Sequence, residues 1–332
     1  METAKQIVPF DDSLIRSVFR SIDVSEKTRK DYERWIDSFI SHCRNGELGY
    51  DTLIEFKRSL AESGSSVSTK NKKLSVARIF LKELTRRRII PPEIVQQEIK
   101  AFRQSKRHKV PGVTLEEVGQ IENALLALPD SIRTRRMTAM FELLAKQGLR
   151  QIEVRRLDLD DVDIKGGTAF VLGKGRDDKE KIFLLPRTVL ALKRYMRLRG
   201  EEPGPLFLTL SDRPSERITT MTINREMKAL FERAGVSKTI HGLRHFYVTA
   251  LLRRFSPTDV QKFSRHRSIE MVQIYNDEMD LGERADEVSE YLDSMFTSPK
   301  YQTYIDESDC RSVIGLEVRK CALESSAPAT IR

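Results

Sequence analysis

The sequence predicts a mainly α-helical protein of two domains, with a small antiparallel β-sheet in the second. Apolar residues recur at the i, i+3, i+4 spacing of helices over most of the chain, whereas residues 162–185 alternate like short strands between turn signals. The length of 332 residues, 39% of them hydrophobic, exceeds one ordinary domain and is enough to bury two cores.

Three helices are expected in the first domain, over residues 25–44, 50–63 and 68–88. Ser25 is placed to cap the first helix, whose apolar face is formed by Tyr32, Trp35, Ile36, Phe39 and Ile40. The apolar side of the third helix consists of Leu74, Ala77, Phe80, Leu81 and Leu84. Pro91 and Pro92 interrupt the pattern, and a short fourth helix is expected over residues 94–102.

The polar, basic stretch SKRHKVPG at 105–112 is the expected linker. We therefore divide the chain into a first domain at 1–107, a second at 108–282 and a C-terminal segment at 283–332. In the second domain Thr114 is expected to cap a helix, and a longer helix covers 131–147 before Gly148. The strands are DVDI, TAFVL and KIFLL, and helices resume at Thr188. The C-terminal segment is acidic, is helical in pattern only to Phe296, and is expected to end in a flexible tail.

Charge is concentrated near the N-terminus. The net charge is +9, and residues 1–110 hold 23 Lys and Arg against 15 Asp and Glu. This excess favours a polyanionic partner such as DNA, although a solvated helical face gives the same count. The candidate DNA-binding residues are Lys70, Lys72, Lys73, Arg78, Lys106, Arg107 and Lys109.

Several classes of protein are disfavoured. No apolar run is long enough to cross a bilayer, and the N-terminus METAKQIVPFDD lacks the apolar core of a signal peptide. The three cysteines are far apart and lack the spacing of a metal site. We expect a cytoplasmic protein with reduced thiols, no membrane partner, no metal and no cofactor.

Four segments hold the groups of chemical interest: KQGLRQIEVRRL with Arg150 and Glu153, LGKGRDDKEK with Lys174, HGLRHFYVTALL with His241, Arg244 and His245, and SRHRSIEMVQIY with His266 and Tyr275. Taken singly each has an ordinary structural explanation: a surface ion pair, a hairpin turn, a core histidine or a packed tyrosine.

Together these groups match the needs of phosphodiester cleavage. Two guanidiniums can hold the extra negative charge on the non-bridging oxygens, because arginine is always charged and offers a planar fork of donors. A histidine can accept the tyrosine proton, and a lysine on a hairpin can protonate the departing sugar oxygen. No acidic cluster has metal-ligand spacing, so side chains are expected to stabilise the charge.

The order of Arg150, Lys174, His241-x-x-Arg244, His266 and Tyr275 resembles the catalytic residues of the tyrosine recombinase family, which includes Xer recombinases and phage integrases. The resemblance covers residues 20–295, and HGLRHFYVTALL is especially similar to the family's second arginine segment. It implies that Arg150 and Arg244 bind the scissile phosphate and that Tyr275 is the nucleophile. It further implies that Lys174 is the general acid, that His241 assists proton transfer and that His266 hydrogen-bonds the phosphate. Glu153 matches an acidic position that supports the first arginine. His245 is expected to support the catalytic residues without touching the substrate.

The sequence departs from the family at three positions. Arg265 stands where the family commonly has glycine. A phosphate contact and a solvent-facing side chain are the two alternatives for it, and we expect the side chain to face solvent. Met271 and Val272 replace a frequent pair of threonines. Lys179 and Lys181 share the hairpin with Lys174 and remain competitors for the role of acid, although Lys174, 24 positions after Arg150, fits the family pattern.

The resemblance implies a helical, SAM-like core-binding domain and a catalytic domain that together clamp duplex DNA. It also implies a 3′-phosphotyrosyl intermediate, inverted-repeat sites, and a homotetramer on two sites that is a monomer or weak oligomer off DNA, in a cytoplasmic, nucleoid-associated setting. The lack of an added N-terminal arm-binding domain favours the simpler Xer-like or transposon-borne enzymes. A type IB topoisomerase, a catalytically silent DNA-binding protein and a metal-dependent nuclease are the alternatives. The target sequence, accessory proteins and the choice among dimer resolution, integration and transposition stay open.

Overall fold

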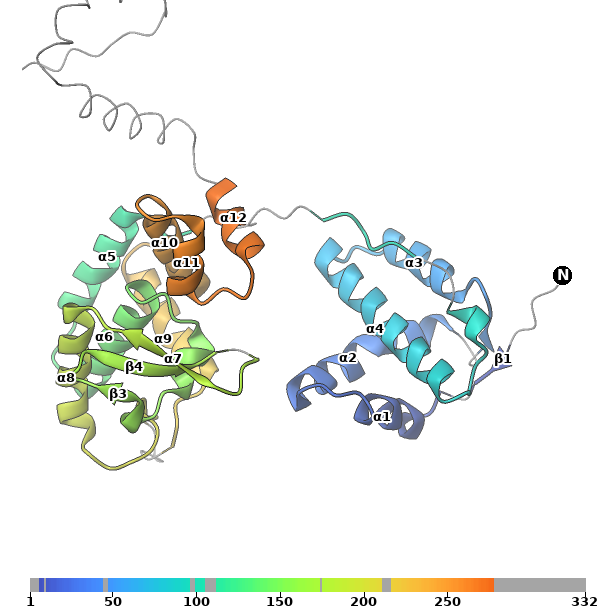
Figure 1. Cartoon of the computed structure of the whole chain (residues 1–332), viewed down its shortest axis with the longest axis horizontal. Helices are drawn as coiled ribbons and strands as arrows, with labels where there is room; N and C mark the ends of the chain where they lie inside the picture. The colour runs from blue at the N-terminus through green and yellow to red at the C-terminus, as the bar shows by residue number, and fades with distance from the viewer. Residues whose placement is uncertain are drawn as a thin grey trace, which may run out of the picture. The chain divides into compact units, whose positions relative to one another are not determined.

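The computed structural model describes residues 6–8, 10–43, 47–95, 99–104, 112–173, 175–210 and 216–277. The chain forms two compact units, Met1–Lys106 and Arg107–Arg332, each with its own hydrophobic core (Figure 1). This division falls one residue before the predicted boundary. The roles of the units as core-binding and catalytic domains stay predictions, and the segment 283–332 lies outside the described residues.

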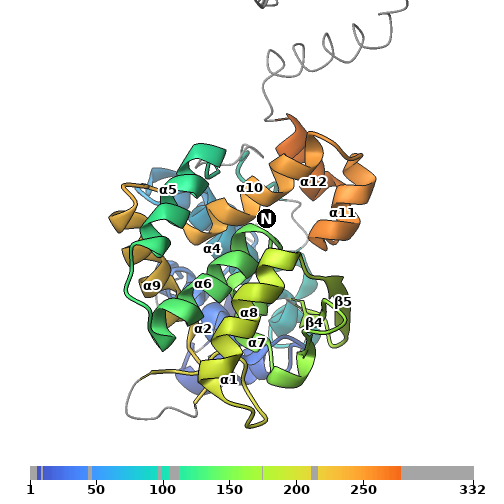
Figure 2. The same cartoon turned by 90° about the vertical axis from the view of Figure 1, so that its left-hand side faces the viewer.

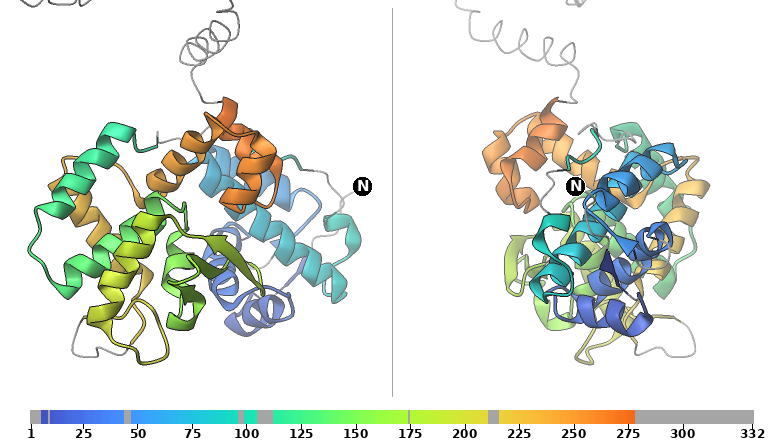
Figure 3. Two further views of the ribbon diagram at one scale, coloured as in Figure 1. Left: turned by 60° about the vertical axis from the view of Figure 1, so that its left-hand side comes forward. Right: turned by 90° about the vertical axis from the view of Figure 1, so that its right-hand side faces the viewer.

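Four helices form the first unit: α1 (Asp12–Arg20), α2 (Glu26–His42), α3 (Thr52–Glu62) and α4 (Val67–Arg86). Helix α4 packs against the other three, as the right-hand view of Figure 3 shows. Ser25 caps α2 as predicted, because its side chain accepts from the backbone N–H of Thr28. The predicted apolar side of α4 is fully buried, and a short antiparallel pair of β1 (Gln6–Ile7) and β2 (Glu47–Leu48) accompanies the bundle. Helix α1 was not among the predicted helices.

The predicted fourth helix at 94–102 was wrong. The structure has a 3₁₀ turn, η2 (Pro92–Ile94), and residues 99–104 follow no helical path. The cause is a contact distant in sequence. The Asn71 side chain donates to the Phe102 carbonyl at 3.0 Å and accepts from the Phe102 N–H at 2.8 Å. With both backbone groups bound to a side chain on α4, Phe102 cannot take part in the i→i+4 bonds of a helix.

The second unit contains α5 (Leu115–Leu126), α6 (Ile132–Ala145), α7 (Gln151–Arg156), α8 (Pro186–Arg199), α9 (Thr220–Arg233), α10 (Ile240–Leu252), α11 (Pro257–Ser264) and α12 (Ile269–Asp277), with a 3₁₀ turn, η3 (Leu159–Asp161). Thr114 caps α5 in a complete capping box with Glu117, as its position predicted. Helices α6 and α8 lie side by side through the middle of the unit (Figure 2).

A three-stranded antiparallel sheet, ordered β3 (Val162–Asp163), β4 (Thr168–Leu172) and β5 (Lys179–Phe183), lies beside these helices (Figure 1). Leu172 pairs with Lys179, so the β4–β5 hairpin turns over residues 173–178. The third strand begins and ends two residues earlier than predicted, because Pro186 already opens α8 behind an extended Leu185. The mainly helical fold with a small antiparallel sheet is confirmed.

Helices α10, α11 and α12 pack together at one end of the unit (Figure 1). Their contact is a separate hydrophobic cluster of Val248, Leu252, Val260, Val272 and Tyr275. This cluster places the predicted nucleophile among apolar side chains next to α10, the helix that carries His241, Arg244 and His245.

Candidate active site

Arg150 and Glu153 form an ion pair at the start of α7. The Arg150 Nη1 donates to Glu153 Oε1 at 2.8 Å, and the Arg150 backbone N–H donates to Glu153 Oε2 at 2.9 Å. Glu153 is fully buried, whereas 28% of the Arg150 side chain is exposed. The Glu153 carboxylate thus holds the Arg150 guanidinium through Nη1 and leaves part of the Arg150 side chain exposed to a ligand.

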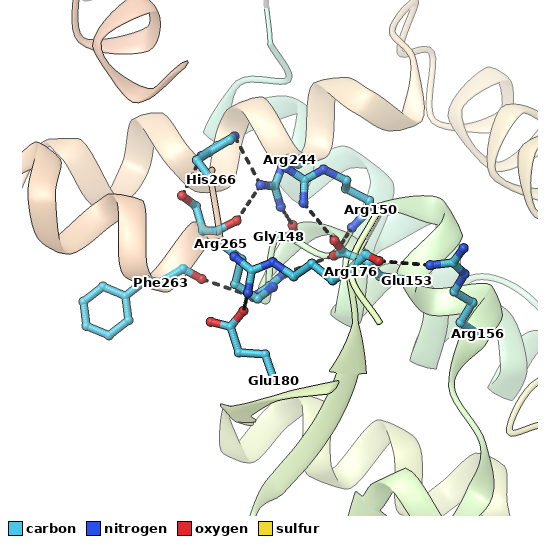
Figure 4. Close-up of polar contacts among 12 residues, drawn as sticks. Gly148, Arg150, Glu153, Arg156, Arg176, Glu180, Arg244, Phe263, Arg265 and His266 are labelled. Atoms are coloured by element: carbon cyan, nitrogen blue, oxygen red, sulfur yellow. Dashed lines mark hydrogen bonds and ion pairs between the residues drawn. The ribbon is translucent and has the colours of Figure 1, made fainter. Parts of the chain in front are cut away.

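Arg265 does not face solvent, and the expectation that it would was wrong. Its side chain is 5% exposed, and its Nη2 lies 3.3 Å from Glu153 Oε2 (Figure 4). Arg265 ends α11 at φ 56° and ψ 41°, a left-handed conformation that costs a residue other than glycine about 1–2 kcal/mol. This backbone geometry explains why glycine suits the position, and it directs the arginine inward to a buried carboxylate.

The Glu153 carboxylate is ionised in this setting. Its burial would raise the pKa, but the charge of Arg265 and the hydrogen bonds from Arg150 outweigh burial and hold the pKa of Glu153 below its ordinary value. The Glu153 carboxylate is therefore the counter-ion of two guanidiniums, those of Arg150 and Arg265.

Arg244 lies on α10 and is 2% exposed. Its Nη1 donates to the Gly148 carbonyl, and its Nη2 donates to the Ser264 carbonyl at 2.5 Å, so segments before α7 and at the end of α11 hold it (Figure 4). Burial and then the charge of Arg150 lower the pKa of Arg244 to about 10. The group stays charged at neutral pH, and its Nε has no hydrogen-bond partner within the described part of the chain.

His266 is held between Arg244 and Ser264. Its Nε2 lies 3.2 Å from Arg244 Nη2, and its Nδ1 lies 2.7 Å from Ser264 Oγ, which itself donates to the Val260 carbonyl. A guanidinium only donates, so Nε2 accepts and the ring proton resides on Nδ1. Burial and then the charge of Arg244 lower the pKa of His266 to about 3, which keeps the ring neutral.

Tyr275 lies on α12 and is 2% exposed. Its ring centroid is 4.8 Å from that of His245 on α10 and 5.8 Å from that of His266. The ring of His245 thus contacts the predicted nucleophile, and its supporting role stays a prediction. One connected group is formed by residues from three segments that are distant in the sequence: Arg150, Arg244, and the pair His266 and Tyr275.

Two further predicted residues, His241 and Lys174, are not seen in this group. His241 is exposed in the first turn of α10. Lys174 lies outside the described residues, but both of its neighbours are anchored. Arg156 Nη1 donates to the Gly173 carbonyl at 3.0 Å, and Arg267 Nη2 donates to the Gly175 carbonyl. The hairpin is therefore held on one side by α7 and on the other by the residue after His266.

The comparisons with known proteins agree with this geometry. A family model described as "Phage integrase family" matches residues 113–281, half of the chain. The chain belongs to the phage integrase family. This membership supports DNA strand exchange of the tyrosine recombinase type as its activity, and neither the topoisomerase nor the silent DNA-binding alternative is favoured.

Relatives of this integrase-family chain include two Xer recombinases. It is 33% identical to the tyrosine recombinase XerC of Haemophilus ducreyi over 178 residues, which cover 51% of this chain and 55% of that protein. It is 26% identical to the tyrosine recombinase XerA of Pyrococcus furiosus over 258 residues, which cover 76% of this chain and 83% of that protein.

Two solved integrases share the fold. The Tn1549 transposon integrase, in complex with transposon right end DNA, superposes with a TM-score of 0.65 at 15% identity, over 84% of this chain and 99% of that one. A lambda integrase tetramer bound to a Holliday junction superposes with a TM-score of 0.59 at 16% identity, over 82% of this chain and 78% of that one.

The DNA-binding candidates on α4 of this integrase-family chain have different surroundings. Lys72 lies over the ring of Trp35, and Lys70 donates to the Ala61 carbonyl at 2.8 Å. Arg78 is partly buried, which lowers its pKa, and its Nη2 has no partner. Lys73 is half-buried. Lys106, Arg107 and Lys109 lie outside the described residues.

Sequence reasoning missed three contributors to the site. Ser264 sets the tautomer of His266, Arg267 anchors the hairpin, and Gly112 packs on His245. The closeness of Ser264 and Arg267 to His266 was the available signal, whereas Gly112 offered none. Among the residues described, no group of three or more His, Cys, Asp or Glu could hold a metal ion, and no helix there is long and apolar enough to cross a membrane.

Proposed function

We propose that this chain is a site-specific recombinase that cleaves and rejoins DNA strands with Tyr275 as its nucleophile. The reactions are those of integration, excision or resolution. The observation that carries the proposal is the connected group of Arg150, Arg244, His266 and Tyr275. In such a group the guanidiniums can stabilise the negative charge of a phosphodiester under attack, and the phenol can supply the attacking oxygen.

The proposed reaction conserves bond energy. The Tyr275 oxygen attacks the scissile phosphorus and loses its proton with help from His241, while Lys174 gives a proton to the leaving 5′-oxygen. The products are a 3′-phosphotyrosyl bond and a free 5′-hydroxyl. A 5′-hydroxyl of another strand then attacks this bond and releases Tyr275, so the number of phosphodiester bonds is unchanged.

Arg150 and Arg244 hold the non-bridging oxygens of the phosphate. The partial exposure of Arg150 and the unpartnered Nε of Arg244 support this role. In the arrangement described above, His266 supports Arg244 through Nε2, so its contact with phosphate requires a turn of the Arg244 guanidinium or of the ring. Lys179 pairs with Asp161 at 2.5 Å, and Lys181 lies over Phe183, which favours Lys174 as the acid.

The proposed partner is double-stranded DNA. Of the solved integrases with this fold, one is in complex with transposon right end DNA and another is bound to a Holliday junction. We assign to this chain inverted-repeat sites, a homotetramer on two such sites, and a cytoplasmic, nucleoid-associated location. The first unit contributes phosphate contacts through its basic residues, which makes the affinity dependent on salt.

Covalent capture on a nicked suicide substrate tests the proposal. The wild-type chain should give a protein–DNA band on a denaturing gel, and Tyr275→Phe should bind DNA but give no band, because only the hydroxyl is removed. Tyr247→Phe is the matched control: this half-buried tyrosine on α10 packs against the same hydrophobic cluster as Tyr275, and its variant should keep the band. A band from Tyr275→Phe would refute the assignment and point to Tyr247 or Tyr291.

A further inference from the structure

Arg265 occupies a position that favours glycine, yet its side chain is enclosed and engaged. Its φ of 56° is strained for arginine. The guanidinium donates to the Phe263 carbonyl at 3.1 Å and to Glu153 Oε2 at 3.3 Å, and its Nε has no partner among the described residues. A strained backbone and a buried cation are both unfavourable by themselves. The contact of the Arg265 guanidinium with Glu153 is the interaction that offsets these two costs.

Glu153 divides its two oxygens between two arginines (Figure 4). Oε1 accepts from Arg150 Nη1, whereas Oε2 accepts from the Arg150 backbone and from Arg265. Without Arg265, the carboxylate would have a single guanidinium as its counter-ion. That guanidinium is the one assigned to the phosphate, so ligand binding and the pairing with Glu153 would compete for the same cation.

We propose that Arg265 is a positioning residue of this recombinase: it keeps Glu153 charged and oriented, so that Glu153 holds Arg150 toward the scissile phosphate. The proposal rests on the proposed function, in which Arg150 binds that phosphate. Arg265 acts through Glu153 and does not touch the reacting atoms.

The electrostatics around Glu153 support this role. The groups that face it are Arg150 from the start of α7, Arg265 from the end of α11, Arg244 from α10 and the neutral His266. Burial would raise the pKa of Glu153, and Arg265 is foremost among the groups that lower it. Removal of Arg265 should therefore raise the pKa of Glu153, and protonation would begin at a higher pH.

Arg265→Gly and Arg265→Lys are the informative pair of variants. Glycine adopts the left-handed backbone without strain, so the Arg265→Gly variant should retain the fold while it lacks the cation. Lysine keeps both the backbone strain and the charge. We measure the rate of covalent complex formation on the suicide substrate from pH 5 to 9, together with DNA affinity and thermal unfolding of each full-length variant.

Arg265→Gly should cleave about 10- to 100-fold more slowly than wild type at neutral pH, the usual cost of releasing a residue that holds a catalytic group. As the pH is lowered, the cleavage rate of Arg265→Gly should also begin to fall at a higher pH than that of wild type. Arg265→Lys should keep the acid side of the wild-type profile. In a Glu153→Gln background, Arg265→Gly should cause little further loss, because the two residues act as one unit.

A folded Arg265→Gly that cleaves at the wild-type rate, with an unchanged acid side, overturns the proposal. So does an Arg265→Lys whose profile matches that of Arg265→Gly. Arg150→Ala separates this failure from failure of the proposed function. If Arg150→Ala abolishes cleavage while Arg265→Gly does not, only the inference about Arg265 is lost; if Arg150→Ala cleaves normally, the assignment of Arg150 fails first.

Discussion

The ring of His245 meets the ring of Tyr275 edge-on, with 4.8 Å between the ring centroids and 63° between the ring planes. His245 also lies beside Gly112, where the chain enters the described part of the second unit. A Cβ atom placed on Gly112 would lie 2.3 Å from His245 Nδ1. The adjacent Val113 N–H donates to the Gly242 carbonyl at 3.2 Å, which ties this segment to the same helix.

Gly112→Ala should therefore disturb the nucleophile without touching it. The added methyl group forces the His245 ring to shift, which should lower the stability of the second unit by about 1–3 kcal/mol and slow covalent complex formation. Thermal unfolding and the suicide substrate measure the two effects. Gly119→Ala in α5 is the control, because nothing lies within 4 Å of its Cβ position and alanine favours helices. Equal stability and cleavage in wild type and Gly112→Ala would show that the ring has room to move.

Lys174→Ala should be severely slow on normal DNA and largely restored when sulfur replaces the bridging 5′-oxygen. The departing thiolate is much less basic than an alkoxide and needs little help from a general acid. Arg150→Ala and Arg244→Ala should gain far less, because the non-bridging oxygens that they hold are unchanged.

The matched controls for Lys174 are the other two lysines of the hairpin. Lys179→Ala loses a partner of Asp161 and Lys181→Ala uncovers Phe183, so neither should respond to sulfur. Rescue of either one would move the acid to that lysine. If none of the three responds, these lysines bind DNA only.

Glu83→Gln should remove a pH-dependent part of the stability of the first unit. The hydrogen bond from Arg86, with further bonds from Ser21 and Arg87, lowers the pKa of Glu83 from 4.5 to about 2 against the effect of burial. Because the folded pKa is the lower one, the stabilisation is present above pH 4.5 and is lost as the pH falls through about 2.

Trp35, the single tryptophan, lies in this unit and reports its urea unfolding by fluorescence. The difference in unfolding free energy between wild type and Glu83→Gln should shrink as the pH is lowered from about 5 to 2. Glu26→Gln removes an exposed ion pair with Lys30 and should show a much smaller difference. A gap between wild type and Glu83→Gln that stays constant with pH would contradict the assignment.

Removal of residues 283–332 should impair synapsis and recombination more than cleavage of a single strand, because this acidic segment follows every proposed catalytic group. Sedimentation of the truncated chain on DNA measures assembly. A chain that stops after Phe296 is the control, since it keeps the part with a helical pattern. Full recombination and tetramer formation by the chain that lacks residues 283–332 would remove the idea.

Local rules predicted much of the fold. Ser25 and Thr114 cap their helices as their positions indicate, because an N-cap bond spans only three residues. The apolar side of α4 was also predictable, since burial follows helical spacing. Residues 99–102 were not, because Asn71, 31 positions away from Phe102, takes the backbone groups that a helix would use.

The candidate site divides in the same way. The residue types and their order indicated the chemistry. In the structure His266 contacts both Arg244 and Tyr275, and Arg150 lies close enough to Arg244 to lower its pKa. The inward path of Arg265 could not be predicted, because it depends on a left-handed helix end that lies next to a carboxylate 112 positions earlier. The tautomer of His266 likewise follows from the packing of Ser264 and Arg244 around the ring.

The enclosure of Tyr275 has a kinetic consequence. A phosphodiester must touch the phenolic oxygen to react, and a residue that is 2% exposed and packed among Val248, Val260 and Val272 offers little surface for that contact. Under the proposed function, a step that exposes the Tyr275 oxygen precedes each cleavage, and the frequency of that step limits the rate of cleavage however tightly the DNA is held. Two DNA sites that bind this protein with equal affinity would then be cleaved at different rates if they promote that opening step to different extents.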